Sequence, residues 1–163
     1  GWKEQGEEAK LKPGATEQDD WHAGSPETRA RDIQQAFADP DIDAIQTMRG
    51  GYGSAQVVPL LDLDAVGPTP KAFIGLSDIT ALHVAFNKIG LATFYGPSLT
   101  MVGSPSPPAF STERLLQVLR GKTTGPVPPD EDRPTVIAIA PGKATGRVRG
   151  GPLPDFIYHI GTP

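Results

Sequence analysis

Ser77 is the side chain whose type and setting most clearly suggest chemistry. It follows an apolar run at 71–76 and precedes a helical pattern, so the chain passes from strand to helix through G-L-S-D at 75–78. In this setting, called a nucleophile elbow, a serine hydroxyl projects from a tight turn beside a helix end that favours negative charge. The usual pattern is G-x-S-x-G, and Ile79 stands in its last place. The alternative is that Ser77 only caps the helix that follows, as serine commonly does.

A second unusual segment is the glycine-rich loop at 49–53, which reads R-G-G-Y-G. Glycines let a backbone N–H approach a ligand closely, so this loop could form an oxyanion hole or a phosphate cradle. It has neither Walker nor G-x-G-x-x-G spacing, which makes the phosphate interpretation the weaker one. The simpler alternative is that these glycines only form tight turns.

The elements that must position both loops alternate between strand and helix. A Ser-Pro-Glu start at 25–27 and an Asp-Pro stop at 39–40 delimit a helix. Strands are expected at 43–48, 71–76 and 91–95, and further helices at 55–61, 79–89 and 112–119. This alternation predicts an α/β, Rossmann-like, mainly parallel sheet with flanking helices. Both loops follow strands, so they lie at the carboxyl edge, where such sheets bind ligands.

The ends of the chain suggest a piece of something larger. Residues 1–24 are polar and are expected to form a surface loop or a frayed segment. We expect a nucleophile-bearing domain at 1–120 that lacks its first strand. A linker rich in Gly, Pro and Asp follows at 121–134. Residues 135–163 are expected to be the start of a truncated second domain, with a strand at 135–139.

Composition excludes several classes of protein. The absence of cysteine excludes disulfides, thiolate zinc sites and a cysteine nucleophile. A net charge of −4 argues against nucleic acid as a partner, and no apolar run is long enough to span a membrane. The histidines, His22, His83 and His159, show no metal-binding spacing, and His83 falls on an apolar helix face, where a core role is the commoner one.

Several ordered motifs together resemble one known family. They are the segments at 36–45, 49–54, 73–83 and 93–97 and the late glycine-rich stretch at 142–151. In that order they resemble the serine LD-carboxypeptidases, which include muramoyltetrapeptide carboxypeptidases and microcin C immunity proteins. The resemblance covers nearly the whole chain from Gly24 onward.

The resemblance implies a cytoplasmic serine peptidase that cleaves the amide bond between an L-centre and a C-terminal D-amino acid in murein-type peptides. By matching position, Ser77 would be the nucleophile, and the backbone N–H groups of Gly51 and Asp78 would form the oxyanion hole. Arg49 and Tyr52 would help to shape the substrate pocket. No cofactor or metal is implied, the partner is the peptide substrate, and a homodimer is possible.

The sequence also departs from the family pattern. The family completes its triad with a Glu and a His from a C-terminal domain, and neither motif occurs here, so we expect this chain to be inactive alone. Leu76 replaces the commoner Tyr, Tyr95 replaces His, and Pro152 replaces Asn. Two alternatives therefore stay open: a non-catalytic Rossmann-like module that binds a small acidic ligand, and a microcin-type immunity peptidase that acts on a peptidyl-nucleotide.

Overall fold

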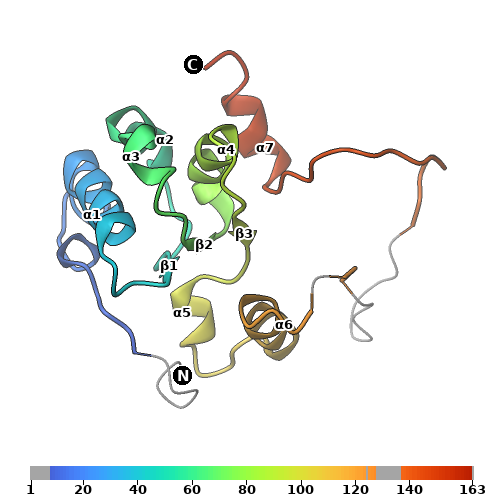
Figure 1. Cartoon of the computed structure of the whole chain (residues 1–163), viewed down its shortest axis with the longest axis horizontal. Coiled ribbons are helices and arrows are strands. Elements are labelled where there is room, and N and C mark those ends of the chain that lie inside the picture. The colour runs from blue at the N-terminus through green and yellow to red at the C-terminus, as the bar shows by residue number, and fades with distance from the viewer. Residues whose placement is uncertain (1–7, 124, 128–136, 163) are drawn as a thin grey trace.

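The centre of the fold is a small parallel sheet. The structure, a computed structural model, describes residues 8–123, 125–127 and 137–162. Within them, β1 (Ala44–Gln46), β2 (Ala72–Gly75) and β3 (Phe94–Tyr95) pair in the order β1-β2-β3, all in parallel (Figure 1). The expected α/β, Rossmann-like class is confirmed.

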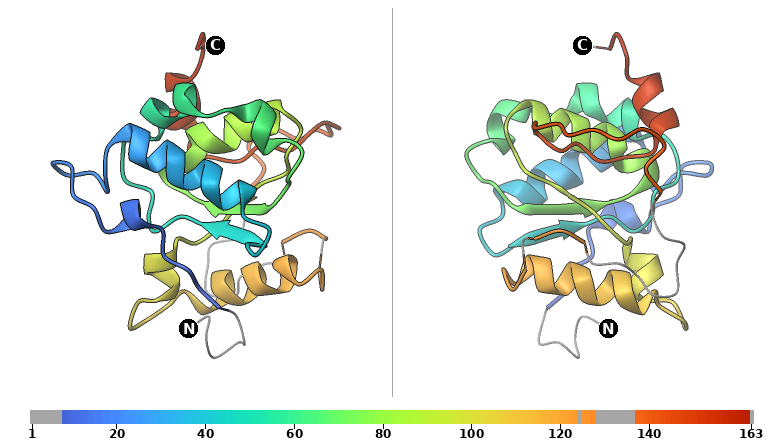
Figure 2. Two further views of the ribbon diagram at one scale, coloured as in Figure 1. Left: turned by 60° about the vertical axis from the view of Figure 1, so that its left-hand side comes forward. Right: turned by 90° about the vertical axis from the view of Figure 1, so that its right-hand side faces the viewer.

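Helices cover both faces of this sheet. On one face lie α1 (Pro26–Ala38), α2 (Ser54–Val57), α3 (Leu63–Val66) and α4 (Thr80–Lys88), and on the other α5 (Leu99–Val102) and α6 (Ala109–Leu119), as Figure 2 shows. Short 3-10 turns, η2 (Pro13–Ala15), η3 (Val58–Leu60) and η4 (Ser77–Ile79), join them, and α7 (Leu153–Tyr158) contacts α4. No helix in the described part of the chain is long and apolar enough to cross a membrane.

The first helix forms where its end signals predicted it. The Ser25 hydroxyl oxygen accepts a hydrogen bond from the Thr28 N–H at 3.2 Å, and Pro26 occupies the first helical position, where its missing N–H costs nothing. The helix ends at Ala38, just before the Asp-Pro pair at 39–40. Gly90, with φ +89°, similarly ends α4 at the expected point.

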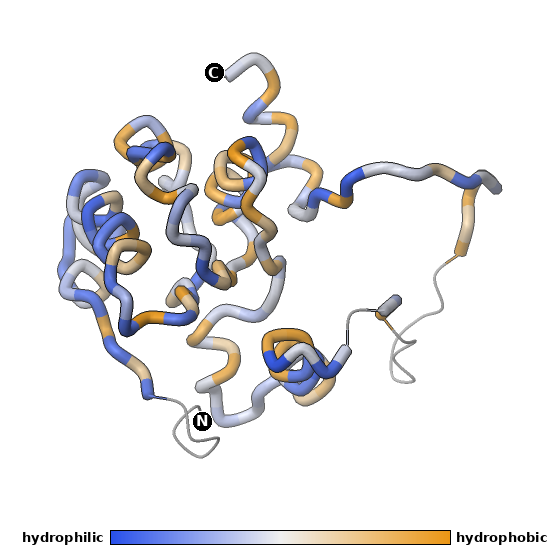
Figure 3. The backbone as a smooth tube through the Cα atoms, in the orientation of Figure 1, coloured by the Kyte–Doolittle hydropathy of each residue, from blue (hydrophilic) through white to orange (hydrophobic). Residues whose placement is uncertain are grey.

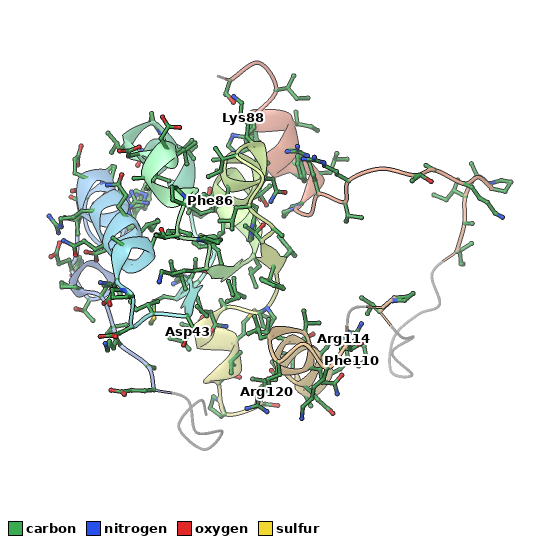
Figure 4. The ribbon with its side chains drawn as sticks, viewed as in Figure 1. Asp43, Phe86, Lys88, Phe110, Arg114 and Arg120 are labelled. Atoms are coloured by element: carbon green, nitrogen blue, oxygen red, sulfur yellow. The ribbon has the colours of Figure 1, made fainter. Side chains whose placement is uncertain are left out.

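Three phenylalanines hold the sheet to its main helical layer. The ring of Phe86 lies 5.3 Å from that of Phe37 on α1 and 4.8 Å from that of Phe73 on β2, both in edge-to-face geometry. Figure 4 labels Phe86 on α4. Adjacent strand residues face opposite sides of a sheet, so Ile74 points the other way, toward α6 and its buried Leu115. Figure 3 shows that apolar residues concentrate along the strands and the helix sides between these layers.

Some elements differ from expectation. The helix expected at 55–61 splits into α2 and η3, since Pro59 has no N–H to continue an α-helical ladder. Of the strand expected at 135–139, residues 135 and 136 lie outside the described residues. The remaining part, 137–139, forms no strand, because its apolar side chains are exposed and no neighbouring strand pairs with it. The helices α3, α5 and α7 are too short for periodicity to reveal.

The described part of the N-terminal segment is anchored rather than loose. The Gly14 N–H donates to the Asp32 carboxylate of α1 at 2.8 Å, in a buried position. A backbone bridge between Asp19 and His22 then folds the chain back toward α1. The expectation of a surface loop was therefore incomplete, because the buried Asp32 carboxylate, 18 residues later in the chain, holds this segment at Gly14.

The aromatic cluster predicts a clear stability result. Phe86→Ala should lower the free energy of unfolding by about 3–5 kcal/mol, because it leaves a cavity at the centre of the core. Phe110→Ala, on the partly exposed face of α6, should cost about 1 kcal/mol or less and serves as the control. Urea unfolding followed by circular dichroism measures both. Equal losses would show that Phe86 is not central to the core.

Candidate active site

Ser77 stands at a sharp bend directly after β2. Its φ of +59° lies in the left-handed region, which L-residues other than glycine rarely adopt. Its side chain is half-buried, and among the described residues its hydroxyl makes no hydrogen bond. The cap residues of η4 and α4 are Leu76 and Ile79, and neither position carries a side-chain cap bond. The interpretation of Ser77 as a simple helix cap is therefore wrong.

Two hydrogen bonds hold the backbone of this bend. The Ser77 N–H donates to the phenol oxygen of Tyr95 at 2.9 Å. The Thr80 hydroxyl donates to the Ser77 carbonyl at 2.6 Å, from one turn into the helix. The serine backbone is thus fixed from the neighbouring strand and from the following helix.

The glycine-rich loop approaches Ser77 where Gly50 lacks a side chain. A Cβ on Gly50 would fall 2.7 Å from the Ser77 Cβ, 3.1 Å from the Leu76 carbonyl oxygen and 3.3 Å from the Ser77 Oγ. Standard bond lengths then place the Gly51 nitrogen within about 7 Å of that Oγ. Gly51 itself has φ +76° and open space where a Cβ would stand. The loop therefore lies beside the serine hydroxyl with room next to it.

Asp78 ties this loop to the bend through its side chain. Its carboxylate accepts the N–H of Ser54, the first residue of α2, at 2.8 Å. A negative charge at this end of a helix is favourable, since the first N–H groups lack carbonyl partners. For the same reason, the Asp78 backbone N–H, in the first turn of η4, has no partner within its helix. Asp78 therefore fixes the loop with its carboxylate and leaves its N–H beside Ser77.

The other end of the loop is held by residues that no sequence pattern singled out. Arg29 of α1 donates to the Gly53 carbonyl at 3.2 Å and to the Gln56 side chain at 3.3 Å. The imidazole Nε2 of His22 would lie 2.9 Å from a Cβ on Gly53, whose φ is +92°. Their signals in the sequence are weak, because each contact joins the loop to a residue more than 20 positions earlier in the chain.

Arg49 and Tyr52 lie on the same loop and face solvent. Arg49 is exposed, and Tyr52 has 87% of its surface accessible. The structure thus brings all five predicted site residues to the carboxyl edge of β1 and β2. The loop leaves both of these side chains free to contact a ligand.

His83 belongs to the core behind this edge. It is 3% exposed, its Nε2 lies 3.1 Å from the Gly75 carbonyl oxygen, and its ring contacts Phe73 and Tyr95 at 5.6 Å and 5.8 Å. Burial lowers the pKa of this imidazole below its ordinary value, against the opposing effect of the Gly75 carbonyl. The expected core role fits this position.

The paired glycines late in the chain also reach this region. A Cβ on Gly150 would fall 3.3 Å from the Tyr95 Cβ, and one on Gly151 would overlap the Thr80 side chain. Both glycines thus pack against side chains that bond the Ser77 backbone. The exposed stretch at 137–149 returns to α4 at this point, immediately before α7 (Figure 1).

Comparison with known proteins gives a consistent result. The sequence profile of a family described as the LD-carboxypeptidase N-terminal domain matches residues 1–96. A relative from Streptomyces coelicolor is 39% identical over 146 residues, which are 88% of this chain and 46% of the relative. The murein tetrapeptide carboxypeptidase of Pseudomonas aeruginosa is 46% identical over 101 residues, which are 59% of this chain and 32% of that protein.

A solved structure extends this likeness to the fold. It is a point mutant of the microcin C7 self-immunity protein MccF, a protein of Escherichia coli, in complex with adenosine monophosphate. It matches 91% of this chain and 52% of its own, with a TM-score of 0.71 and 29% identity. The chain spans about half the length of the first curated relatives that it matches.

Because Gly50 lies so close to Ser77, we expect a larger residue at position 50 to destabilise the fold. Gly50→Ala should lower the free energy of unfolding by about 1–3 kcal/mol, because the new methyl group meets backbone and side chain that cannot both move away. Gly142→Ala, where nothing lies within 4 Å, should change it by about 0.5 kcal/mol or less. Chemical unfolding of both variants makes the comparison, and equal stability would contradict the close approach.

The burial of His83 predicts how stability depends on pH. Because its pKa is lowered in the folded state, the unfolded chain binds the proton more readily, and stability rises with pH. This contribution is complete above the ordinary histidine pKa of about 6.5 and is lost as the pH falls below it. When the pH is lowered from about 7.5 to about 5.5, the melting temperature should fall less for His83→Gln than for the wild type. Equal slopes for the wild type and His83→Gln would contradict the burial of His83.

Proposed function

The chain belongs to the LD-carboxypeptidase family, and from that premise we propose that it carries the nucleophile of a serine carboxypeptidase. The reaction is hydrolysis of the amide bond between an L-centre and a C-terminal D-amino acid in a murein-type peptide. The observation that carries this proposal is the left-handed backbone of Ser77, whose unpaired hydroxyl lies beside Gly50. Strain of this kind concentrates at functional sites.

Each proposed residue has one role. The Ser77 Oγ attacks the scissile carbonyl carbon, and its proton passes to a base. The backbone N–H groups of Gly51 and Asp78 donate to the oxygen that becomes negative, and each such donor contributes about 3 kcal/mol in comparable hydrolases. The C–N bond then breaks, the D-amino acid leaves with the proton from the base, and water hydrolyses the acyl-enzyme.

The general base of the proposed reaction is not among the described residues around Ser77. A serine hydroxyl is a weak nucleophile without an adjacent base, and no described residue accepts the Ser77 proton. We therefore propose that a Glu and a His from a second domain complete the triad, that residues 135–163 begin that domain, and that residues 1–163 are inactive alone. Arg49 and Tyr52 would contact the peptide. A cytoplasmic location and a homodimer belong to the same proposal.

A second candidate is a microcin-type immunity peptidase acting on a peptidyl-nucleotide. It is favoured by the likeness to MccF, which was solved with adenosine monophosphate, and by the exposed ring of Tyr52, which could stack on a base. A non-catalytic module for a small acidic ligand is the third, favoured because no base bonds to the Ser77 hydroxyl among the described residues. Three results distinguish these candidates. The carboxypeptidase releases a D-amino acid, the immunity peptidase cleaves a peptidyl-nucleotide, and the binding module binds its ligand without turnover.

The direct test uses the complete product of the gene that encodes this chain, supplied with an L,D-tetrapeptide. Ser77→Ala should lower release of the terminal D-amino acid by at least about 10³-fold, because no other group replaces the nucleophile. Ser106→Ala, at an exposed position in the segment between α5 and α6, should leave the rate unchanged. Chromatographic analysis of the released amino acid measures both.

Three outcomes would contradict the proposal. Equal release by wild type and Ser77→Ala would exclude the assigned nucleophile. Cleavage of a peptidyl-nucleotide but not of the tetrapeptide would favour the microcin-type activity instead. Calorimetry that finds tight binding of an acidic ligand to a protein without either activity would favour the binding module.

A further inference from the structure

Tyr95 has a contact with Ser77 that its place in the sequence does not suggest. We propose that Tyr95 is a positioning residue: its phenol oxygen holds the Ser77 N–H and so keeps the nucleophile in its left-handed turn. This inference rests on the proposed function of Ser77 and goes beyond it, because it assigns a residue that sets the geometry of the attacking group.

Strand register brings Tyr95 to this place. Tyr95 pairs with Gly75, two residues before Ser77, and β3 lies directly beside β2 (Figure 1). The chain leaves β2 at Gly75 and turns at Ser77, so the bend stands beside the last residue of the neighbouring strand. The phenol reaches across this gap and accepts the Ser77 N–H at 2.9 Å.

The Ser77 N–H needs such an acceptor from outside its own element. It is the first N–H of η4, and the first donors of a helix have no carbonyl within that helix. The left-handed turn costs about 1–3 kcal/mol in backbone strain and persists only where its surroundings fix it. The phenol oxygen supplies one of the two hydrogen bonds that do so, and the Thr80 hydroxyl supplies the other.

The tyrosine ring is itself held from two directions. Toward the core it contacts His83, with ring centroids 5.8 Å apart. From the other side Gly150 approaches, so that a Cβ there would lie 3.3 Å from the Tyr95 Cβ. Tyr95 as a whole is 47% exposed, yet its hydroxyl is held by the bond to the Ser77 N–H. Tyr95 therefore links the late glycine pair to the backbone of the nucleophile.

The first measurement is amide hydrogen exchange by NMR on residues 1–163. In Tyr95→Phe the Ser77 amide should exchange about two- to tenfold faster, since one hydrogen bond is lost. The Gly96 amide, which donates to the Gly75 carbonyl at 3.0 Å in the same sheet, should keep its rate. Tyr158→Phe, which removes an exposed hydroxyl on α7, should change neither amide.

Two results of this experiment would overturn the inference. An unchanged Ser77 amide would show that the phenol does not hold it. Equal acceleration of the Ser77 and Gly96 amides would show that Tyr95 only stabilises the sheet.

The second measurement is steady-state hydrolysis of the tetrapeptide by the complete gene product. Tyr95→Phe should lower kcat about two- to tenfold and leave KM unchanged, because the phenol orients the attacking group and does not touch the substrate. An unchanged kcat, or a change in KM alone, would overturn the positioning role. If the wild type itself releases no D-amino acid, the proposed function fails, and the exchange rate of the Ser77 amide still decides whether the phenol fixes the turn.

Discussion

The left-handed backbone of Ser77 is the constraint on which the rest of the site depends. A serine at φ +59° is unfavourable by itself, so its neighbours must hold it there. Tyr95 and Thr80 do so through hydrogen bonds to the N–H and carbonyl of the same residue. Because both bonds use the backbone, the hydroxyl stays free for chemistry, which is the property that a nucleophile at a strand-to-helix turn requires.

Close packing around this turn explains why small residues surround it. A Cβ on Gly75 would meet the Ile79 side chain at 2.5 Å, and one on Gly50 would meet Ser77 at 2.7 Å. Gly151 is similarly confined against Thr80. Two other segments, at Gly50 and Gly151, therefore approach the bend as bare backbone, and Gly75 leads into it without a side chain. These glycines allow close backbone contacts as well as tight turns. As a result, the loop at 49–53 lies close enough to Ser77 for its N–H groups to face a bound carbonyl.

Local signals predicted much of this arrangement, and long-range contacts account for the rest. The helix beginning at Pro26 and the strand-to-helix passage through Ser77 follow from neighbours in sequence, which caps and periodicity describe well. The bond from Ser77 to Tyr95 depends on the register of two strands, and the bond from Asp78 to Ser54 depends on how two loops meet. Neither has a sequence pattern. The short helix α7 was missed for the same reason, since its packing on α4 forms it.

The most direct test of the central claim is covalent capture of the nucleophile. The complete gene product is treated with a fluorophosphonate, which forms a stable bond to an activated serine oxygen, and the adduct is located by tandem mass spectrometry. We predict a single adduct on Ser77. An adduct on a different residue would contradict the account. So would the absence of any adduct.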